Sequence, residues 1–337
     1  MNRLPALPRV PLATLPTPLQ AAPRLSEELG VEVWFKRDDL TGLGLGGNKV
    51  RGLEYLIGDA LDQGCDCLVT GAGPQSNWAM LAALAARRSG LEPHLVFYGS
   101  PVPPAGNLLL DEMIGAEIHY TGEADRASVD HGIDALADKL HAAGRRPYPL
   151  PRGGATALGA AGYFRASLEL SGQLLTAGVV PAQLWLATGS CGTQAGLVAG
   201  ARWLHAPYEV IGVSVSRPVE QCTERVGALA ESVTQLLELP VDDTRGQVTV
   251  LGGHIGPGYG LRSEEGEAAA ALVARTEGVF LDPVFAAKAM GALIGWAREE
   301  LLDGPVVFLV SGGAPTLFSP QPRVRVSRNA ARVQEAL

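Results

Sequence analysis

Short runs of apolar and β-branched residues alternate along the chain with longer segments in which apolar positions recur at helical spacing. The runs that predict buried strands cover residues 31–36, 67–70, 94–98, 184–188, 210–215 and 306–310. The segments that predict helices cover residues 51–63, 77–89, 156–171, 193–203, 263–276 and 286–302. Because strands separated by helices pair in parallel, this alternation predicts an α/β protein with helices on both faces of its sheets. Ligands of such proteins bind beyond the carboxyl ends of the strands.

The length of 337 residues and a hydrophobic content of 47% suit one large or two intertwined α/β lobes. A proline and glycine cluster at 147–154 is typical of a crossing between lobes. Several prolines among the first 18 residues interrupt any signal-peptide core, so this segment is expected to lie over the body as an extended arm. The basic tail at 319–328 is expected to be a surface strap or a frayed end.

Charge and composition exclude several classes of function. The net charge is −8 and no run of basic residues precedes the C-terminal tail, which argues against nucleic acid or an anionic membrane as partner. No apolar run is long enough to span a bilayer, and the cytoplasm is the default location. The four cysteines form neither a disulfide framework nor a zinc motif, and the six histidines have no metal-ligand spacing, so no metal is expected.

Lys49 is the first candidate for chemistry. Of 27 basic residues only four are lysine, and Lys49 stands where a glycine-rich run meets a helical segment. An amine, unlike a guanidinium, can lose its proton and attack a carbonyl. A helix N-terminus and burial both lower the pKa of such an amine. The alternative is an ordinary lysine whose charge reaches the surface.

A glycine-bearing loop at Thr188-Gly-Ser-Cys-Gly-Thr193 follows a predicted strand and opens a predicted helix. This arrangement presents backbone N–H groups to a phosphate. The loop has neither the lysine of a nucleoside triphosphate site nor the spacing of a dinucleotide site, so a monophosphate fits best. Taken alone, such a loop is as often a plain tight turn.

Three further segments carry polar groups at strand ends. In Gln75-Ser76-Asn77, the serine and asparagine stand at a predicted helix start, where a substrate carboxylate or a plain N-cap would be favoured. Ser311 follows a strand and precedes two glycines, which allows a flat ring to approach the backbone. Tyr259 lies in a glycine-rich loop at 252–260, where a functional or a structural role is equally consistent with the sequence.

A carbonyl-reactive lysine, a monophosphate site, a carboxylate pocket and a hydroxyl facing a ring together indicate a pyridoxal 5'-phosphate enzyme that acts on an amino acid. The sequence also resembles the D-cysteine desulfhydrase and 1-aminocyclopropane-1-carboxylate (ACC) deaminase family, of the tryptophan synthase β-like fold. The resemblance covers nearly the whole chain. Its main motifs are Lys36-Arg-Asp-Asp39, Gly46-Gly-Asn-Lys-Val-Arg51, Gln75-Ser-Asn77, Thr188-Gly-Ser190, Gly192-Thr-Gln-Ala-Gly196, Asp282-Pro-Val284 and Gly312-Gly313.

The resemblance implies fold type II, with two open twisted parallel-sheet domains and flanking helices. It implies a large cofactor-binding domain of residues 1–50 and 161–337, and a small domain of residues 51–160. It also implies a homodimer.

By the same resemblance, Lys49 is the Schiff-base lysine, and Ser76 receives the substrate carboxylate and takes part in proton transfer. Asn77 lies beside the phenolic oxygen of the cofactor, and Tyr259 is one of two active-site tyrosines. The phosphate site is expected at Thr188, Gly189, Ser190, Cys191, Gly192 and Thr193, and Ser311 is expected to face the pyridine nitrogen. A neutral hydroxyl there does not force a proton onto that nitrogen, which favours β-elimination over transamination.

The sequence departs from the family pattern at the substrate pocket. Trp78 stands where relatives have histidine or glutamine, and Phe285 stands where they have tyrosine. Ala286 replaces the glutamate of ACC deaminases, and Cys191 replaces a glycine or threonine. These changes disfavour ACC deamination and predict a more apolar pocket lined by Trp78 and Phe285, suited to another β-substituted amino acid.

The sequence therefore predicts a lyase that converts a small amino acid to an α-keto acid, ammonia and sulfide or another leaving group. ACC deaminase and a specialised lyase or racemase of secondary metabolism are the alternatives within this fold. A paralogue that binds the cofactor or an amino acid without turnover is the non-enzymatic alternative. A nucleotide-binding oxidoreductase is a further alternative, which we do not expect.

Overall fold

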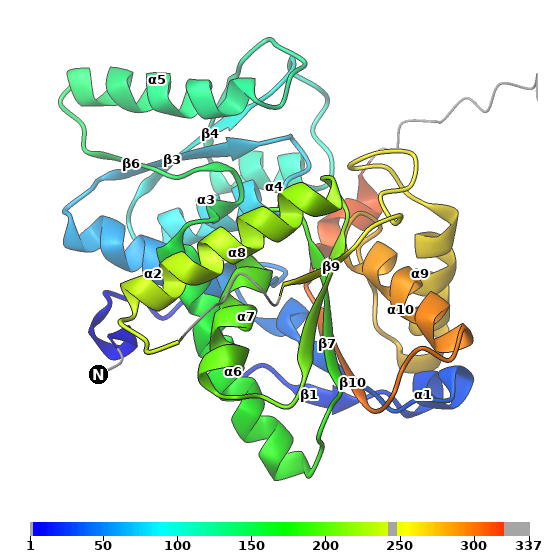
Figure 1. Ribbon diagram of the computed structural model, residues 1–337. Coiled ribbons are helices and arrows are strands. Elements are labelled where there is room, and N and C mark those ends of the chain that lie inside the picture. The colour runs from blue at the N-terminus through cyan, green and yellow to red at the C-terminus, as the bar shows by residue number, and fades with distance from the viewer. Residues whose placement is uncertain (1–2, 242–247, 320–337) are drawn as a thin grey trace, which may run out of the picture.

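The computed structural model describes residues 3–241 and 248–319 and contains two open, twisted sheets (Figure 1). The larger sheet has the strand order β1-β2-β10-β7-β8-β9. Strand β1 pairs antiparallel with β2, and the other pairs are parallel. These strands are β1 (Leu19–Ala21), β2 (Val33–Arg37), β7 (Gln183–Thr188), β8 (Glu209–Ser214), β9 (Thr249–Leu251) and β10 (Val306–Val310).

The smaller sheet is entirely parallel and has the order β5-β4-β3-β6. Its strands are β3 (Cys67–Ala72), β4 (Glu92–Phe97), β5 (Glu117–Tyr120) and β6 (Pro147–Pro149). Residues of β3 and β4 are almost all buried, as expected for inner strands covered by helices on both faces.

Helices cover both faces of both sheets (Figure 1). In the larger unit, α6, α7 and α8 pack on one face of the sheet and α1, α9 and α10 on the other. In the smaller unit, α2, α3 and α4 lie on one side and α5 on the other. Their bounds are α1 (Pro23–Leu29), α2 (Lys49–Asp62), α3 (Asn77–Arg88), α4 (Asn107–Ile114), α5 (Ser128–Ala142), α6 (Ala157–Ala177), α7 (Gly192–Trp203), α8 (Val219–Leu236), α9 (Glu264–Glu277) and α10 (Ala286–Arg298). Four 3-10 turns are η1 (Leu4–Ala6), η2 (Asp38–Leu40), η3 (Arg152–Gly154) and η4 (Ala314–Phe318).

The predicted fold class is confirmed, and each of the predicted strands and helices is present. Helix α6 extends six residues beyond its predicted end, and α10 ends four residues before its own. The N-terminal arm lies along α2, where the Val10 N–H donates to the carbonyl of Glu54 (2.9 Å). Residues 320–328 of the predicted basic tail lie outside the described residues, and the domain limits at 50/51 and 160/161 stay predictions. Among the described residues, no helix combines the length and apolar composition that a membrane span requires.

Candidate active site

A cavity of about 360 Å³ lies at the carboxyl ends of strands from both sheets, as expected for an open α/β fold. Strands β3, β4, β7 and β10 all end at or beside it. The predicted site residues that line it are Lys49, Ser76, Asn77, Trp78, Thr188, Gly189, Ser190, Cys191, Thr193, Tyr259, Phe285 and Ser311. Gly192 is the one predicted residue outside the lining, and it begins α7 directly behind the loop.

Lys49 is the first residue of α2, and its Nζ lies 3.4 Å from Ser190 Oγ across the cavity. Burial lowers the pKa of Lys49 to about 8, because the ammonium form loses its hydration. The preceding Asn48 is tied to both neighbouring elements. Its backbone N–H donates to the carbonyl of Ser311 (2.9 Å), and its side-chain amide donates to Thr193 Oγ1 (3.0 Å). The lysine therefore stands on a fixed helix start that faces the glycine loop.

Glycines allow this helix start to lie close to the end of β10 and to the turn after β2. Gly47 and Gly312 form a β-bridge, and a Cβ added at Gly312 would lie 2.7 Å from the Cα of Gly47. Gly312 also has a φ of +84°, in the region that favours glycine. At Gly46, an added Cβ would lie 1.9 Å from the carbonyl oxygen of Asp39. Glycine is thus required at 46 and 312 for two reasons: the backbone has a positive φ, and neighbouring backbone leaves no room for a Cβ.

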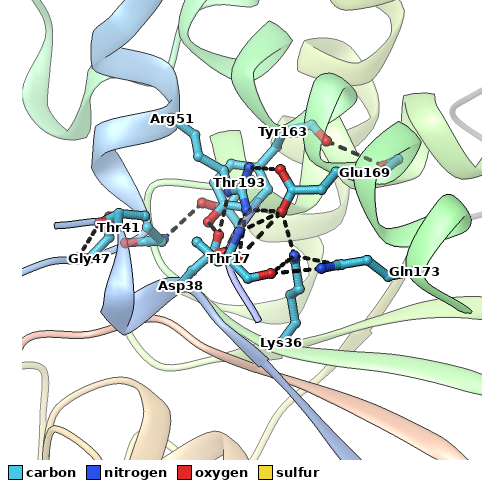
Figure 2. Close-up of polar contacts among 12 residues, drawn as sticks. Thr17, Lys36, Asp38, Thr41, Gly47, Arg51, Tyr163, Glu169, Gln173 and Thr193 are labelled. Atoms are coloured by element: carbon cyan, nitrogen blue, oxygen red, sulfur yellow. Dashed lines mark hydrogen bonds and ion pairs between the residues drawn. The ribbon is translucent and has the colours of Figure 1, made fainter. Parts of the chain in front are cut away.

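A buried network of charges fixes α2 two residues after Lys49 (Figure 2). The Arg51 guanidinium donates twice to Asp38 (2.7 and 2.8 Å) and twice to Glu169 (3.0 and 2.8 Å). A fifth bond joins Arg51 to Thr17 Oγ1 (2.9 Å). The Tyr163 hydroxyl donates to Asp38 as well. This network, here called the Arg51 network, joins the end of β2, the start of α2 and the middle of α6.

Lys36 extends the Arg51 network along β2. Its ammonium donates to Glu169 Oε1 (2.5 Å), to the carbonyl of Thr17 (2.7 Å) and to Gln173 Oε1 (2.7 Å). Burial lowers the pKa of Lys36 even though Glu169 favours its charged form. At Asp38 burial opposes ionisation, but the charge of Arg51, the hydrogen bonds from Arg51 and Tyr163 and the charge of Lys36 together hold the pKa of the carboxyl below its ordinary value. The sequence motifs contain Lys36, Asp38 and Arg51 but not Glu169, and nothing in them indicated a closed ionic network.

The predicted phosphate loop has the geometry of an anion site. Thr188 ends β7, and Cys191 turns the chain into α7 with a φ of +76°. The first N–H groups of α7 have no partner within the helix. The carbonyls of the loop are bound from behind, because Arg217 Nε donates to Gly189 (3.1 Å) and Arg225 Nε to Ser190 (3.2 Å).

Thr188 Oγ1 is buried and has no hydrogen-bond partner. A buried hydroxyl without a partner is uncommon unless a ligand supplies one. Together with the two guanidinium groups behind the loop, this orphaned hydroxyl fits a bound phosphate. Sequence analysis missed Arg217 and Arg225, because both lie after β8, far from the loop in sequence.

The second polar cluster stands at the start of α3. Ser76 is the N-cap, and its Oγ accepts from the Ala79 N–H (3.2 Å). Its predicted role toward the substrate carboxylate stays a prediction. Asn77 Oδ1 accepts from Asn107 Nδ2 (2.7 Å), which fixes the orientation of the Asn77 amide. The Asn77 NH₂ group lies over Gly313, where an added Cβ would be 2.4 Å from Nδ2. A donor of fixed position therefore lies at the cavity wall, beside the start of a helix.

Trp78 borders the cavity but belongs mainly to the core. Its indole N–H donates to Thr70 Oγ1 (2.9 Å), and the ring packs within the cluster between α2 and α3. An added Cβ at Gly154 would lie 2.2 Å from the ring. The indole is thus held in place on several sides, and it forms a rigid part of the cavity wall.

An aromatic pair forms the opposite wall. The rings of Tyr259 and Phe285 meet edge to face, with centroids 6.2 Å apart and an interplanar angle of 76°. The guanidinium of Arg126 lies 3.8 Å above the Tyr259 ring, in a cation–π contact. Sequence analysis missed Arg126, which precedes α5 in the smaller unit and reaches across the cavity to the larger one.

Two buried charges hold these aromatic residues. Lys288 Nζ donates to the carbonyls of Ile255 (2.5 Å) and Gly258 (3.3 Å), and so fixes the loop that carries Tyr259. Asp282 accepts three backbone N–H bonds at the start of α10, including that of Phe285 (2.9 Å). Burial raises the pKa of Asp282 to about 6, and these bonds partly oppose the shift. Asp282, in the Asp282-Pro-Val284 motif, and Lys288, on α10, thus have a positioning role at the cavity.

Comparison with known proteins agrees with this geometry. The family described as "pyridoxal-phosphate dependent enzyme" matches residues 10–312. The chain is 40% identical to the D-cysteine desulfhydrase of Klebsiella pneumoniae (strain 342), over 96% of this chain and 99% of that protein. It is 38% identical to the D-cysteine desulfhydrase of Salmonella choleraesuis (strain SC-B67), with the same coverage.

Solved structures give the same result. A crystal structure of an ACC deaminase homologue superposes with a TM-score of 0.88 and 36% identity, and 94% of each chain is covered. The structure of a threonine deaminase from Solanum lycopersicum superposes with a TM-score of 0.67 at 17% identity, covers 99% of this chain and 91% of its own, and shows a shared fold. The chain therefore belongs to the pyridoxal-phosphate dependent enzymes, in the family that includes the D-cysteine desulfhydrases.

Proposed function

We propose that this enzyme is a D-cysteine desulfhydrase in which Lys49 holds pyridoxal 5'-phosphate. The observation that carries the proposal is the placement of Lys49 Nζ, 3.4 Å from the Ser190 hydroxyl of the anion-binding loop and in the same cavity as Ser76 and Asn77. The full-length similarity to two D-cysteine desulfhydrases supports the choice of substrate.

When bound, the cofactor supplies an aldehyde that reacts with amines and a ring that withdraws electrons from Cα of the amino acid. The loop from Thr188 to Thr193 would hold its phosphate through backbone N–H groups, the Thr188 hydroxyl and the positive charge behind the loop. Asn77 would donate to an oxygen of the ring. Ser311, at the end of β10, would present a neutral hydroxyl to the ring nitrogen.

The protein groups would then position the substrate and move one proton. The N-terminus of α3, with Ser76 at its cap, would bind the substrate carboxylate through free N–H groups. Lys49, with a pKa of about 8, has an appreciable neutral fraction near pH 7.5 and can accept the proton from Cα. Tyr259 would assist the departing sulfur.

The proposed reaction balances without an oxidant or reductant. The Cα–H bond and the Cβ–S bond break, and the sulfur leaves with the electron pair of its bond and takes up protons as hydrogen sulfide. Water then adds to the remaining unsaturated amine and releases ammonia. One D-cysteine and one water thus give pyruvate, hydrogen sulfide and ammonia.

ACC deamination is the second candidate, favoured by the similarity to the ACC deaminase homologue. Phe285 argues against it. Its ring takes part in the edge-to-face pair with Tyr259 and has no hydroxyl to donate at the cavity wall. A homodimer in the cytoplasm, and a specialised lyase or racemase activity, are further proposals that rest on family resemblance alone.

The test supplies the purified holoenzyme with D-cysteine, L-cysteine and ACC in separate reactions and measures keto acid and sulfide. We expect pyruvate and sulfide in equal amounts from D-cysteine, with a rate at least tenfold above that from L-cysteine. The variant Lys49→Ala should lose the visible absorbance of the cofactor and at least 1,000-fold of the rate. The matched control Lys139→Ala removes an exposed lysine of α5 and should change neither.

Three outcomes would contradict parts of the proposal. Formation of 2-oxobutyrate from ACC, without sulfide from either cysteine, would replace the desulfhydrase by the second candidate. Full turnover by Lys49→Ala would remove that residue from its proposed role. Spectral changes with amino acids but no keto acid would indicate a different reaction in the same cavity.

A further inference from the structure

A second cluster of chemistry-bearing side chains lies on the smaller sheet, away from the cavity. His94 is the third residue of β4, and Glu117 and His119 are the first and third residues of the edge strand β5. The parallel register pairs His94 with Glu117. Because side chains alternate along a strand, all three project from the face that α5 covers (Figure 1).

In this cluster, each histidine has a nitrogen that lies as close to a Glu117 oxygen as two ligands of one metal lie to each other. His94 Nδ1 is 3.3 Å from Glu117 Oε2, and His119 Nε2 is 3.5 Å from Glu117 Oε1. One ligand atom from each residue can be chosen so that all three lie within 4.8 Å of one another. In a tetrahedral zinc site with bonds of about 2.0–2.1 Å, neighbouring ligand atoms lie about 3.3–3.4 Å apart.

These contacts are close but are not hydrogen bonds. Neither nitrogen of His94 has a hydrogen-bond partner although the residue is only 2% exposed, and His119 Nε2 is likewise buried without one. A histidine that is this deeply buried and makes no hydrogen bond is unusual. The buried nitrogens therefore lie close to a carboxylate and still lack a hydrogen-bond partner, which a bound ligand would supply.

Imidazole nitrogens and a carboxylate oxygen are ligands that zinc accepts in proteins. The rings of His94 and His119 stack with centroids 5.8 Å apart. Nearby, Arg145 is engaged by Glu92 (2.7 Å), and Lys139 on α5 is the other cation close to the cluster.

We infer that His94, Glu117 and His119 form a binding site for a divalent transition metal, with Zn²⁺ as the best match to two imidazoles and a carboxylate. The fourth position would be filled by water, because Glu117 is 56% exposed and the site opens at the sheet edge. A metal there would join the edge strand β5 to β4. Residues far apart in sequence form the site, which explains why the spacing of the histidines gave no sign of it.

The site is independent of the proposed reaction. The cavity begins at Tyr98, just beyond the carboxyl end of β4, whereas His94 lies four residues earlier, about 13 Å along the strand. The expected role of the metal is to stabilise the smaller sheet. Failure of the desulfhydrase proposal would leave this inference unaffected, and the reverse also holds.

The experiment loads the holoenzyme with ZnCl₂, removes loosely bound metal by desalting, and measures zinc per chain by mass spectrometry together with the melting temperature. The variants are His119→Gln and Glu117→Gln, whose side chains are partly exposed and whose loss should leave the fold intact. The control is His131→Gln, an exposed histidine on α5. The four cysteines remain in every variant, so zinc bound at thiols would be equal in all of them.

We expect about one retained zinc per chain and a zinc-dependent rise in melting temperature for the unmodified protein and for His131→Gln. Both variants at the cluster should retain at least tenfold less zinc, and their melting temperature should not respond. Equal zinc in all four proteins would place the metal elsewhere and overturn the inference. Absence of bound zinc in the unmodified protein at micromolar free metal would overturn it as well.

Discussion

Replacement of Arg51 by methionine tests whether the Arg51 network holds the active-site helix in place. Arg51 is 1% exposed and Asp38 is fully buried, and the guanidinium makes five hydrogen bonds of 2.7–3.0 Å. Methionine fills much of the volume but removes every bond. Asp38 and Glu169 would then remain with their charges only partly neutralised by Lys36.

Breaking a buried ion pair by removing one partner costs about 3–5 kcal/mol, because it leaves a buried charge without compensation. For 337 residues, an unfolding entropy of about 2.1 cal/mol/K per residue converts this cost to a fall in melting temperature of about 4–7 °C. Since Lys49 lies two residues before Arg51 on α2, the rate of the enzyme should fall together with stability.

The matched control is Arg145→Met. Arg145 also contacts two carboxylates, Glu92 (2.7 Å) and Asp66 (3.3 Å), but it is 33% exposed. Pairs of this kind contribute about 0–1 kcal/mol, so its melting temperature should change by no more than about 1–2 °C. Thermal unfolding followed by circular dichroism compares the two variants. If Arg51→Met lost no more stability than Arg145→Met, the assignment of the network as the anchor of α2 would be refuted.

Four further predictions concern the cavity and the helix start beside it. Because burial lowers the pKa of Lys49 to about 8, the rate at which the cofactor-free protein rebinds pyridoxal 5'-phosphate should rise with a midpoint near pH 8, and a midpoint near 10.5 would contradict the shift. Between pH 8 and pH 10.5, Lys49 is protonated in the unfolded chain but neutral in the folded protein, so the buried lysine lowers the free energy of unfolding as the pH falls through this range. The Lys49→Met variant should therefore be more stable than the unmodified protein at pH 7, and this difference should vanish above pH 10.5. Lys288→Met should lower kcat about tenfold with a small change in melting temperature, because Lys288 holds the loop that carries Tyr259. The control Lys139→Met, at an exposed position, should change neither quantity. Equal kcat values for the two variants would show that the Tyr259 loop does not need Lys288 to hold it in place. Gly312→Ala should destabilise the protein more than Gly30→Ala, since both have positive φ but only the first would meet neighbouring backbone, and equal melting temperatures would exclude a packing requirement.

The pattern of the chain was sufficient for the inner strands, because burial on both faces gives an unbroken apolar run. It also predicted α2, α3, α6, α7, α9 and α10, but not α5 or α8. Edge strands did not give an unbroken apolar run. In β5, Glu117-Ile-His-Tyr120, no residue is fully buried, and β1, β6 and β9 are three residues long. Helix α8 was also not predicted, although its sequence carries a helical signal. Its buried positions at 222, 226, 230 and 233 recur at helical spacing and could have been recognised.

Those cavity residues that lie at the end of a strand or the start of a helix could be predicted from the sequence. Lys49, Ser76 and the loop after Thr188 all do, and the parallel topology brings such positions to one edge. The groups that were missed reach the cavity from elsewhere. Arg126 and Arg217 act through contacts with Tyr259 and with a backbone carbonyl, and neither contact has a local sequence pattern.

The interior of this protein contains charged residues at positions that apolar residues could have filled. Lys36, Arg51 and Lys288 are buried, and each is bonded to groups on other elements rather than on its own. An apolar residue would pack equally well in several orientations, whereas a guanidinium with five bonds fits one arrangement of three elements. Buried ion pairs contribute little net stability compared with apolar packing. We therefore attribute these buried charges to positioning: the Arg51 network fixes α2 and Lys288 fixes the Tyr259 loop, both beside the cavity, where a small displacement of a reactive group lowers the rate steeply.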